Sequence, residues 1–168
     1  MTLEELLDSA EKILHPWTVG LTRFEGRRLD IVVKRDDLCP AVAALVDARW
    51  GYLSAITGLD LPWPKTPPKG EAPPAVPFED ELEILYHFVN VAAIATIRVR
   101  VPYSDARVPS ICGPVPTATL YERELQEMFG ITVEGTPVTD KLLLPDDWPD
   151  GVYPLRKSFT GFDSVSSK

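Results

Sequence analysis

The distribution of prolines limits what this chain can fold into. The 168-residue sequence contains 17 prolines, and seven of them fall within the sixteen residues 62–77, "PWPKTPPKGEAPPAVP". Proline lacks the N–H that a helix interior or a sheet ladder requires, and its fixed φ favours extended polyproline conformations. Pro145, Pro149 and Pro154 impose the same restriction near the C-terminus. We therefore expect an exposed loop at 62–77, and regular structure only before and after it.

The hydrophobic spacing outside these segments predicts an α/β (α+β) fold, with helices packed on a mixed β-sheet. Helical periodicity covers 3–14, a stretch from Asp36 or Asp37 to about Arg49, and a third stretch within 117–131. Strand patterns cover 18–24, 27–34, 52–61, 81–90 and 94–102. The first two strands flank "EG" and predict a hairpin. Gly51 is expected to cap the second helix.

The chain is expected to divide into an α/β domain at 1–141 and an extended docking arm at 142–168. The arm begins "LLLPDDWPDGVYPLRKSF", which combines helix-breaking prolines with leucine and aromatic residues. Irregular chain with this much apolar surface is unstable in water unless it lies along the domain, along a partner, or along both. Charged residues are interleaved with the apolar ones, as at an interface with an apolar centre and a polar rim.

Charge and hydropathy exclude several classes of function. The formal net charge of −8 disfavours non-specific binding to nucleic acid and to anionic lipid, because both depend on clustered lysine and arginine. No apolar run approaches the ~20 residues that span a bilayer. The chain is therefore expected to be soluble and cytoplasmic, although it could sit on a membrane complex through a protein partner.

The predicted helix within 117–131 contains a carboxylate on its apolar side. Thr119 and Glu122 have the spacing of a capping box, and Gly130 suits the position after the helix. Glu124 leans toward the apolar stripe, so it must reach water or pair with a cation. Arg156 is the expected intramolecular partner, and an arginine of another protein is the alternative. On the opposite, solvated side, Arg123 and Glu127 are expected to form a weak ion pair.

The sequence offers little support for catalysis on this chain. His15 and His87 lie too far apart for a local metal motif, and Cys39 and Cys112 match no metal or redox spacing. Phosphate-binding loops, nucleophile elbows and cysteine clusters for iron–sulfur centres are also missing from the sequence. We expect no catalytic, cofactor-binding or metal-binding residues here.

Six short motifs occur in a fixed order in the second half of the chain. They are "RVPSI" at 107–111, "YEREL" at 121–125, "MFGI" at 128–131, "EGTP" at 134–137, "LPDDWP" at 144–149 and "YPLRKSF" at 153–159. In order and spacing they resemble the thirty-kilodalton subunit family of respiratory complex I, the C-subunit type of NADH dehydrogenase. That family includes the equivalent subunits of membrane-bound NiFe hydrogenases and related ion-pumping complexes. Leu120, Gln126 and Thr136 depart from the usual complex I pattern, and the "LPDDWPDGVYPLRK" segment looks closer to the hydrogenase branch.

The resemblance implies a non-catalytic subunit in the hydrophilic arm of a membrane-bound, ion-translocating oxidoreductase. Such a subunit packs on the large subunit that carries the quinone or NiFe site, and iron–sulfur clusters are expected on neighbouring subunits. The residues expected at this interface are Tyr121, Glu122, Arg123, Glu124, Met128, Phe129, Gly130, Pro145, Asp146, Asp147, Trp148, Tyr153, Pro154, Leu155, Arg156 and Lys157. The electron donor, the acceptor and the pumped ion stay open.

An autonomous cytoplasmic protein-binding module is the alternative, with the acidic surface or the Pro-rich loop as its binding site. The two hypotheses make different predictions about the arm. A binding module should fold its apolar arm back entirely on its own domain, whereas a subunit should leave the arm and one helix face partly exposed.

Overall fold

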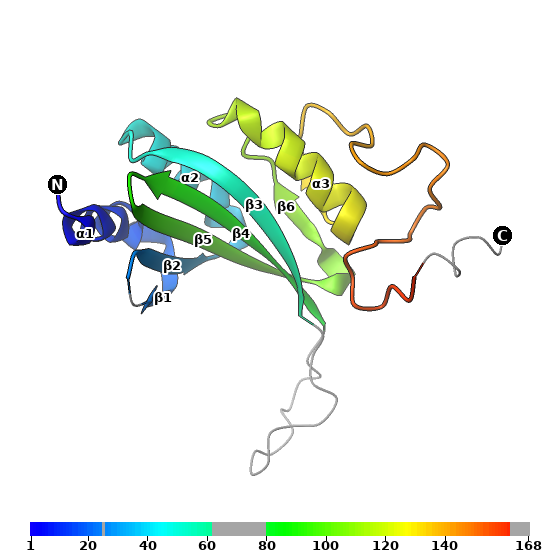
Figure 1. Cartoon of the computed structure of the whole chain (residues 1–168), viewed down its shortest axis with the longest axis horizontal. Coiled ribbons are helices and arrows are strands. Elements are labelled where there is room, and N and C mark those ends of the chain that lie inside the picture. The colour runs from blue at the N-terminus through cyan, green and yellow to red at the C-terminus, as the bar shows by residue number, and fades with distance from the viewer. Residues whose placement is uncertain (25, 62–79, 162–168) are drawn as a thin grey trace, which may run out of the picture.

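A computed structural model describes residues 1–24, 26–61 and 80–161 of the chain, and its centre is a five-stranded mixed sheet (Figure 1). The strands are β1 (Thr18–Phe24), β2 (Arg28–Val33), β3 (Tyr52–Leu61), β4 (Glu81–Asn90) and β5 (Ala93–Pro102). Their order in the sheet is β1-β2-β5-β4-β3. Strands β2 and β5 run parallel, while the other neighbours are antiparallel. The predicted α/β class with a mixed sheet is confirmed.

Three α-helices lie on one side of this sheet, as Figure 1 shows. They are α1 (Leu3–Leu14), α2 (Leu38–Asp47) and α3 (Thr119–Phe129). Alternate residues of the strands face these helices and are almost fully buried, including Leu29 and Ile31 of β2 and Ile97 and Val99 of β5. Because the intervening residues point to the opposite face, the helices share one apolar layer, and none of the described helices covers the other face.

A second, two-stranded sheet frames α3. Strand β6 (Arg107–Pro109) precedes the helix, strand β7 (Thr132–Glu134) follows it, and the two pair in parallel. The sequence predicted irregular chain before the helix, and this prediction is wrong for the three residues of β6. Strands of three residues carry too short a pattern to be recognised locally, and pairing across the helix is what stabilises them.

Most local predictions for the first half are confirmed. Helix α1 ends before Pro16, and β1 and β2 form the expected hairpin. The predicted role of Gly51 is wrong, because α2 ends at Asp47 with Ala48 as its cap. Gly51 instead has φ +130°, and a Cβ there would lie 2.2 Å from the Val89 carbonyl oxygen. Only glycine fits this turn into β3.

Two predicted segments lie at or beyond the limits of the described residues. The Pro-rich loop at 62–77 lies outside them. The arm is described to residue 161 and contains no helix or strand over 142–161, as the prolines predicted. None of the described helices is long and apolar enough to cross a membrane.

Candidate partner interface on helix α3 and the arm

Helix α3 begins differently from the prediction. A 3-10 turn at Pro116–Ala118 leads directly into the helix, so Thr119 already has helical angles of φ −52° and ψ −37°. An N-cap residue needs extended angles to aim its side chain at the free N–H groups. The Thr119 hydroxyl therefore caps nothing, and the predicted capping box is wrong.

Glu122, the other half of that motif, is instead buried against the loop that follows β6. Its carboxylate accepts hydrogen bonds from the Ser110 hydroxyl at 2.8 Å, the Ile111 N–H at 2.8 Å and the Cys112 thiol at 3.1 Å. Its relative exposure is 1%. Three donors offset part of the cost of desolvating a carboxylate. Glu122 thus fastens the loop to α3, and its side chain has no surface left for a partner.

The surroundings of Glu122 do not favour nucleophilic chemistry at the two cysteines. The Cys39 thiol contacts the Ser110 carbonyl oxygen at 3.4 Å, on the other side of the same loop. Burial raises the pKa of Cys39 and of Cys112, and the nearby Glu122 carboxylate raises both further. Because the thiolate is the reactive form, these raised pKa values disfavour a nucleophile or metal ligand.

Glu124 is the carboxylate that the helical pattern singled out, and its predicted pairing with Arg156 is wrong. Among the described residues it forms no hydrogen bond or ion pair, and it lines a small hollow of about 130 Å³ beside Leu155. Arg156 donates instead to the Phe129 carbonyl oxygen at 2.6 Å, at the C-terminal end of α3. The partial negative charge of that helix end attracts the guanidinium without any carboxylate.

Arg156 is also held by two aromatic rings. Its guanidinium carbon lies 4.7 Å from the centre of the Tyr103 ring and 4.6 Å from that of Tyr153. Cation–π contacts of this kind are worth about 0.5–2 kcal/mol. They fix the side chain at the helix end and keep it away from Glu124.

The polar side of α3 holds the start of the arm. Arg123 donates to the carbonyl oxygens of Asp140 and Lys141, both at 2.8 Å. Glu127 accepts from the N–H groups of Leu142 at 2.9 Å and Leu143 at 2.6 Å. The predicted Arg123–Glu127 pair is therefore wrong, because each side chain binds arm backbone that would otherwise be left unpaired.

Lys141 organises the next turn of the arm. Its ammonium group donates to three backbone carbonyl oxygens, those of Pro145, Asp146 and Trp148, at 3.0–3.1 Å. An ammonium has three donors, so this arrangement uses all of them. The turn is therefore ordered by a charge at its centre rather than by buried side chains.

The last described part of the arm returns to the sheet. The Leu155 N–H donates to the Met128 carbonyl oxygen at 3.1 Å, and the Lys157 N–H donates to the Asp60 carboxylate at 2.7 Å. The same buried carboxylate accepts from the Tyr103 hydroxyl. Burial and this bond to Asp60 raise the pKa of Tyr103, so the phenol stays protonated and keeps donating. The arm thus reaches β3 at Lys157.

Two glycines allow these elements to approach closely. A Cβ on Gly130, which has φ +66°, would lie 2.3 Å from the ring of Tyr153. A Cβ on Gly58 of β3 would lie 2.6 Å from the ring of Phe129. The first glycine lets the arm cross the end of α3, and the second lets α3 settle on the sheet.

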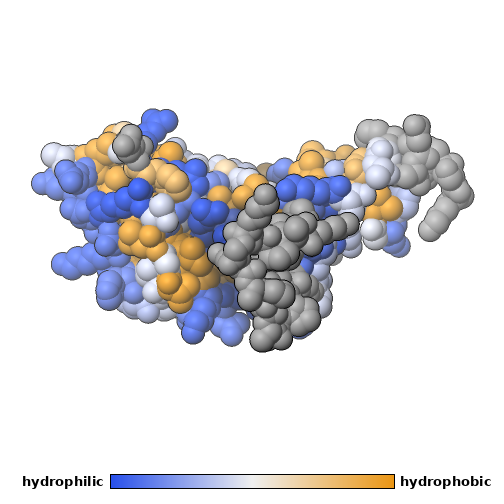
Figure 2. Space-filling view, turned by 90° about the horizontal axis from the view of Figure 1, so that it is seen from below, coloured by the Kyte–Doolittle hydropathy of each residue, from blue (hydrophilic) through white to orange (hydrophobic). Residues whose placement is uncertain are grey.

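Despite these bonds, the arm and the adjoining helix leave apolar side chains in water. Leu143 is 61% exposed and Leu155 is 51% exposed, and no described residue of 142–161 is buried. At the other end of α3, Leu120 is 52% exposed. In Figure 2 the narrower extension at the right, which is the arm, shows orange apolar residues on its surface. This partial exposure matches the expectation for a subunit rather than for an autonomous binding module.

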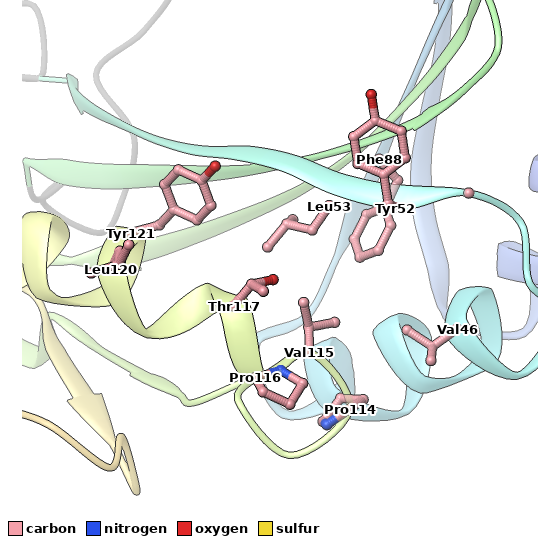
Figure 3. Close-up of a pocket in the computed structure, with 11 residues that line it drawn as sticks. Val46, Tyr52, Leu53, Phe88, Pro114, Val115, Pro116, Thr117, Leu120 and Tyr121 are labelled. Atoms are coloured by element: carbon pink, nitrogen blue, oxygen red, sulfur yellow. The ribbon is translucent and has the colours of Figure 1, made fainter.

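A hollow of about 580 Å³ lies near Leu120, between the end of α2, the start of β3 and the start of α3 (Figure 3). Its lining is mostly apolar and comprises Val46, Gly51, Tyr52, Leu53, Phe88, Pro114, Val115, Pro116, Thr117, Leu120 and Tyr121. The Tyr121 hydroxyl donates to the Ser54 carbonyl oxygen at 2.9 Å, which fixes one wall. Together with the smaller hollow at Glu124, this hollow makes the surface along β3 and α3 uneven. A protruding side chain can fill either hollow.

The structure brings most of the predicted interface residues together and separates others. Those at the α3–arm junction are Arg123, Glu124, Met128, Phe129, Gly130, Tyr153, Leu155, Arg156 and Lys157, whereas Tyr121 lies apart from them in the wall of the larger hollow. Pro145, Asp146 and Asp147 are exposed on the Lys141 turn, which also includes Trp148, and Pro154 follows further along the arm.

The sequence did not identify three residues that position the arm: Asp60, Glu127 and Lys141. Their partners in or next to the arm are backbone groups, which every residue carries, so no sequence pattern marks them. Within the described residues, no three histidine, cysteine or acidic side chains gather closely enough to hold a metal ion. The expectation that this chain has no cofactor stays a prediction.

A family model covers most of the chain. The model described as the 30 kDa subunit of respiratory-chain NADH dehydrogenase matches residues 31–165.

Curated relatives match over different parts of the chain. The C subunit of the NADH-quinone oxidoreductase of Nocardioides sp. is 33% identical over 132 residues, which is 76% of this chain and 47% of that protein. The C subunit of the Moorella thermoacetica enzyme is 32% identical over 77% of this chain and 78% of its own length. Formate hydrogenlyase subunit 5 of Escherichia coli is 47% identical over 62 residues, which is 37% of this chain and 11% of that protein. The chain thus spans about half of the Nocardioides relative.

Two solved structures share the fold. A trypsin-resistant fragment of Nqo5 superposes with a TM-score of 0.60 at 25% identity, over 82% of this chain and 99% of the fragment. A chain of the membrane-bound sulfane sulfur reductase, an archaeal respiratory membrane complex, gives a TM-score of 0.66 at 25% identity. That match covers 96% of this chain and 88% of the other.

Proposed function

Because the chain belongs to the family of the 30 kDa subunit of respiratory-chain NADH dehydrogenase, we propose that it is a non-catalytic subunit of a membrane-bound, ion-translocating oxidoreductase. It packs on the large subunit that carries the quinone or NiFe site and stabilises it. Relatives of both kinds support the class, since they include the C subunit of NADH-quinone oxidoreductase and formate hydrogenlyase subunit 5. The local identity of 47% to the latter favours a hydrogenase-type complex.

One observation carries this proposal: the arm is tied down by its backbone while its apolar side chains stay exposed. Arg123 and Glu127 bind four backbone groups of residues 140–143, where the arm begins, as hydrogen-bond partners rather than as an apolar core. Leu143 and Leu155 remain in water. A surface that is ordered before binding loses less conformational entropy when a partner covers it. The arm is therefore suited to docking against a large neighbour.

Glu124 gives the proposed interface a specific polar contact. Its carboxylate is half-buried beside exposed Leu155, and no cation of the described chain reaches it. Covering it without a partner would cost several kcal/mol, so the neighbour must bring an arginine or lysine to this point. The sequence analysis gave two possible partners for Glu124, which were Arg156 and an arginine of another protein. Because the structure excludes Arg156, the second partner is the one proposed.

The test is assembly of the complex in its native membranes, with a tagged copy of this chain and its co-purifying subunits quantified by mass spectrometry. We expect Glu127→Ala to reduce recovery of the large subunit by loosening the arm. We expect Glu124→Gln to reduce it as well, without loosening the arm. Glu4→Gln, an exposed change on α1, is the matched control and should leave recovery unchanged.

The two variants test the ordering of the arm and the polar contact at Glu124 separately. Full recovery of the large subunit with both Glu127→Ala and Glu124→Gln would remove α3 and the arm as its docking surface. Recovery of the tagged chain alone, in the unmutated form, would favour the binding module instead.

A further inference from the structure

The two edges of the five-stranded sheet are protected to different degrees. An edge strand presents a row of unpaired N–H and C=O groups, which proteins usually shield with short strands, charged residues, prolines or bulges. Strand β1 forms one edge and has seven residues, with a bulge between Thr18 and Gly20. Arg23 of β1 pairs with Asp8 and Glu11 of α1 beside this edge. Strand β1 therefore carries several of the usual protections.

Strand β3 forms the other edge and carries fewer protections. It has ten residues, none of which is proline, lysine or arginine, and its one carboxylate, that of Asp60, is buried. In the described part of the chain, β3 pairs with β4 alone. Tyr121 binds the Ser54 carbonyl oxygen at a bulge near one end of the strand, and the arm binds the Asp60 carboxylate at the other end. Between these points, no described residue outside β4 binds the backbone of 55–59.

The two hollows described above adjoin β3 on the side that carries the helices. Leu53 and Leu120 line the larger one, which Figure 3 shows between β3 and the start of α3. Thr57 and Glu124 line the smaller one. Because Leu53 and Thr57 are four residues apart, they are separated by about 13 Å at the usual rise of a strand. An apolar subsite and an acidic subsite therefore lie at this spacing along β3.

The free edge, the apolar hollow and Glu124 together define what can occupy this surface. An unpaired strand edge is completed by another extended backbone. The side chains of that backbone alternate, so two residues four positions apart point to the same side and lie about 13 Å apart. One of them has to be apolar to enter the larger hollow. The other has to be a lysine or arginine, because no cation of the described chain reaches the half-buried Glu124.

Two segments of the protein itself fit this description poorly. The Pro-rich sequence at 62–77 lacks, at each of its prolines, the N–H group that a strand ladder requires. Strand β3 of a second copy supplies an extended backbone but contains no lysine or arginine. Pairing two copies through β3 would therefore leave both Glu124 carboxylates without a cation.

We propose that an extended segment of the large subunit adds to the free edge of β3 as a further strand. This inference rests on the proposed function, because it specifies how that subunit binds beside α3 and the arm. Backbone hydrogen bonds to 55–59 hold the segment. An apolar side chain fills the larger hollow next to Leu120, and a basic side chain four positions along the segment pairs with Glu124.

Photo-crosslinking in the assembled membrane complex locates the segment. Leu120→benzoylphenylalanine and Leu155→benzoylphenylalanine each put a photoreactive side chain at one hollow, since both leucines are exposed there. We expect both variants to cross-link to the large subunit, at positions within about six residues of each other. A lysine or arginine should lie at the end of the segment that Leu155 contacts. Val19→benzoylphenylalanine, at an exposed site on the opposite edge strand, is the matched control and should not reach this segment.

The cross-linked partners decide between this inference and the alternatives. Contacts with two distant parts of the large subunit, with another subunit, with a second copy of this chain, with its own 62–77 segment or with nothing would each overturn the added strand. Recovery of the large subunit in those cases would leave the proposed function standing. Absence of the large subunit from the purified complex would remove the proposed function as well.

A synthetic peptide of the cross-linked sequence tests the strand geometry on the full-length chain. N-methylation of a peptide bond removes one backbone N–H donor and keeps the side chains. Methylation at the alternate residues whose N–H groups face β3 should weaken binding about ten-fold or more, whereas methylation at the intervening residues should have little effect. Similar effects of the two sets, or no binding of the unmodified peptide, would overturn the proposal.

A charge exchange tests the contact at Glu124. Glu124→Arg should lower recovery of the large subunit about ten-fold, because it opposes two cations. Replacing the cross-linked basic residue of the large subunit by glutamate should restore recovery. Glu4→Arg, an exposed change on α1, is the matched control and should leave recovery unchanged. A second change that restores nothing would show that Glu124 pairs elsewhere, and it would overturn the assigned contact.

Discussion

The sheet layer and the C-terminal arm of this protein are held in place by different forces. The sheet and its three helices bury a continuous apolar layer, in which Ile97 and Leu125 are almost inaccessible. The arm buries none of its described residues, and backbone hydrogen bonds to Arg123, Glu127 and Lys141 position it. Apolar burial is non-directional and hydrogen bonds are directional. The first therefore stabilises a domain, and the second fixes the course of a chain whose side chains remain available to a partner.

The largest effect is expected where α3 joins the sheet layer. Phe129→Ala removes the ring that packs on Gly58, and large-to-small changes of this kind cost about 3–5 kcal/mol. Urea unfolding of the isolated chain, followed by circular dichroism, measures this loss. Leu155→Ala, in the exposed part of the arm, should change the unfolding free energy by less than about 0.5 kcal/mol. Equal losses in the two variants would contradict the distinction between the two regions.

An intermediate and local effect is expected in the arm. Glu127→Ala removes the acceptor for the N–H groups of Leu142 and Leu143. Amide hydrogen exchange at these two residues should become roughly ten-fold faster, equivalent to about 1.4 kcal/mol. Exchange in β5 should stay unchanged, because the core does not depend on the arm. Glu124→Gln is the matched control on the same helix, and faster exchange in that variant would show that the carboxylate does bind the arm.

The smallest effect is expected from pH and is confined to the sheet. His87 lies between the hydroxyls of Thr57 and Thr96, and burial lowers its pKa below the ordinary 6.5, with a further decrease from Arg28. Above pH 6.5 this residue adds no pH dependence, because it is neutral in both states. As the pH falls below 6.5, the unfolded chain takes up the proton first, so stability is lost until the folded pKa is passed.

The measurement for His87 is the urea midpoint at pH 7.5 and at pH 5.5. The unmutated chain should lose more stability over this interval than His87→Gln, which has no proton to take up, and the arm should exchange at an equal rate in both. A loss of equal size in the two proteins would show that His87 titrates as it does in the unfolded chain.

The α3 segment shows how much of the structure the local hydrophobic pattern can predict. Helical periodicity placed the helix within 117–131, although Thr119 is its first residue rather than its cap, and the same periodicity pointed to a carboxylate on the apolar side. It selected Glu124, yet Glu122 is the buried one, because the loop at 110–112 folds over that side of the helix. A helical wheel gives the direction of each side chain relative to the axis, but it does not show what covers that direction.

The sequence predicted the three helices, the five strands of the main sheet, the irregular arm and the family, but not the short strands β6 and β7. Hydrophobic period, proline and ordered motifs are properties of neighbouring residues, so they can be read locally. Three arrangements depend on tertiary packing: Arg156 donates to the Phe129 carbonyl oxygen, Glu127 binds the arm backbone, and arginines cover Asp30 and Glu83. These contacts join residues distant in sequence, and several use backbone groups common to every residue, so packing alone selects them.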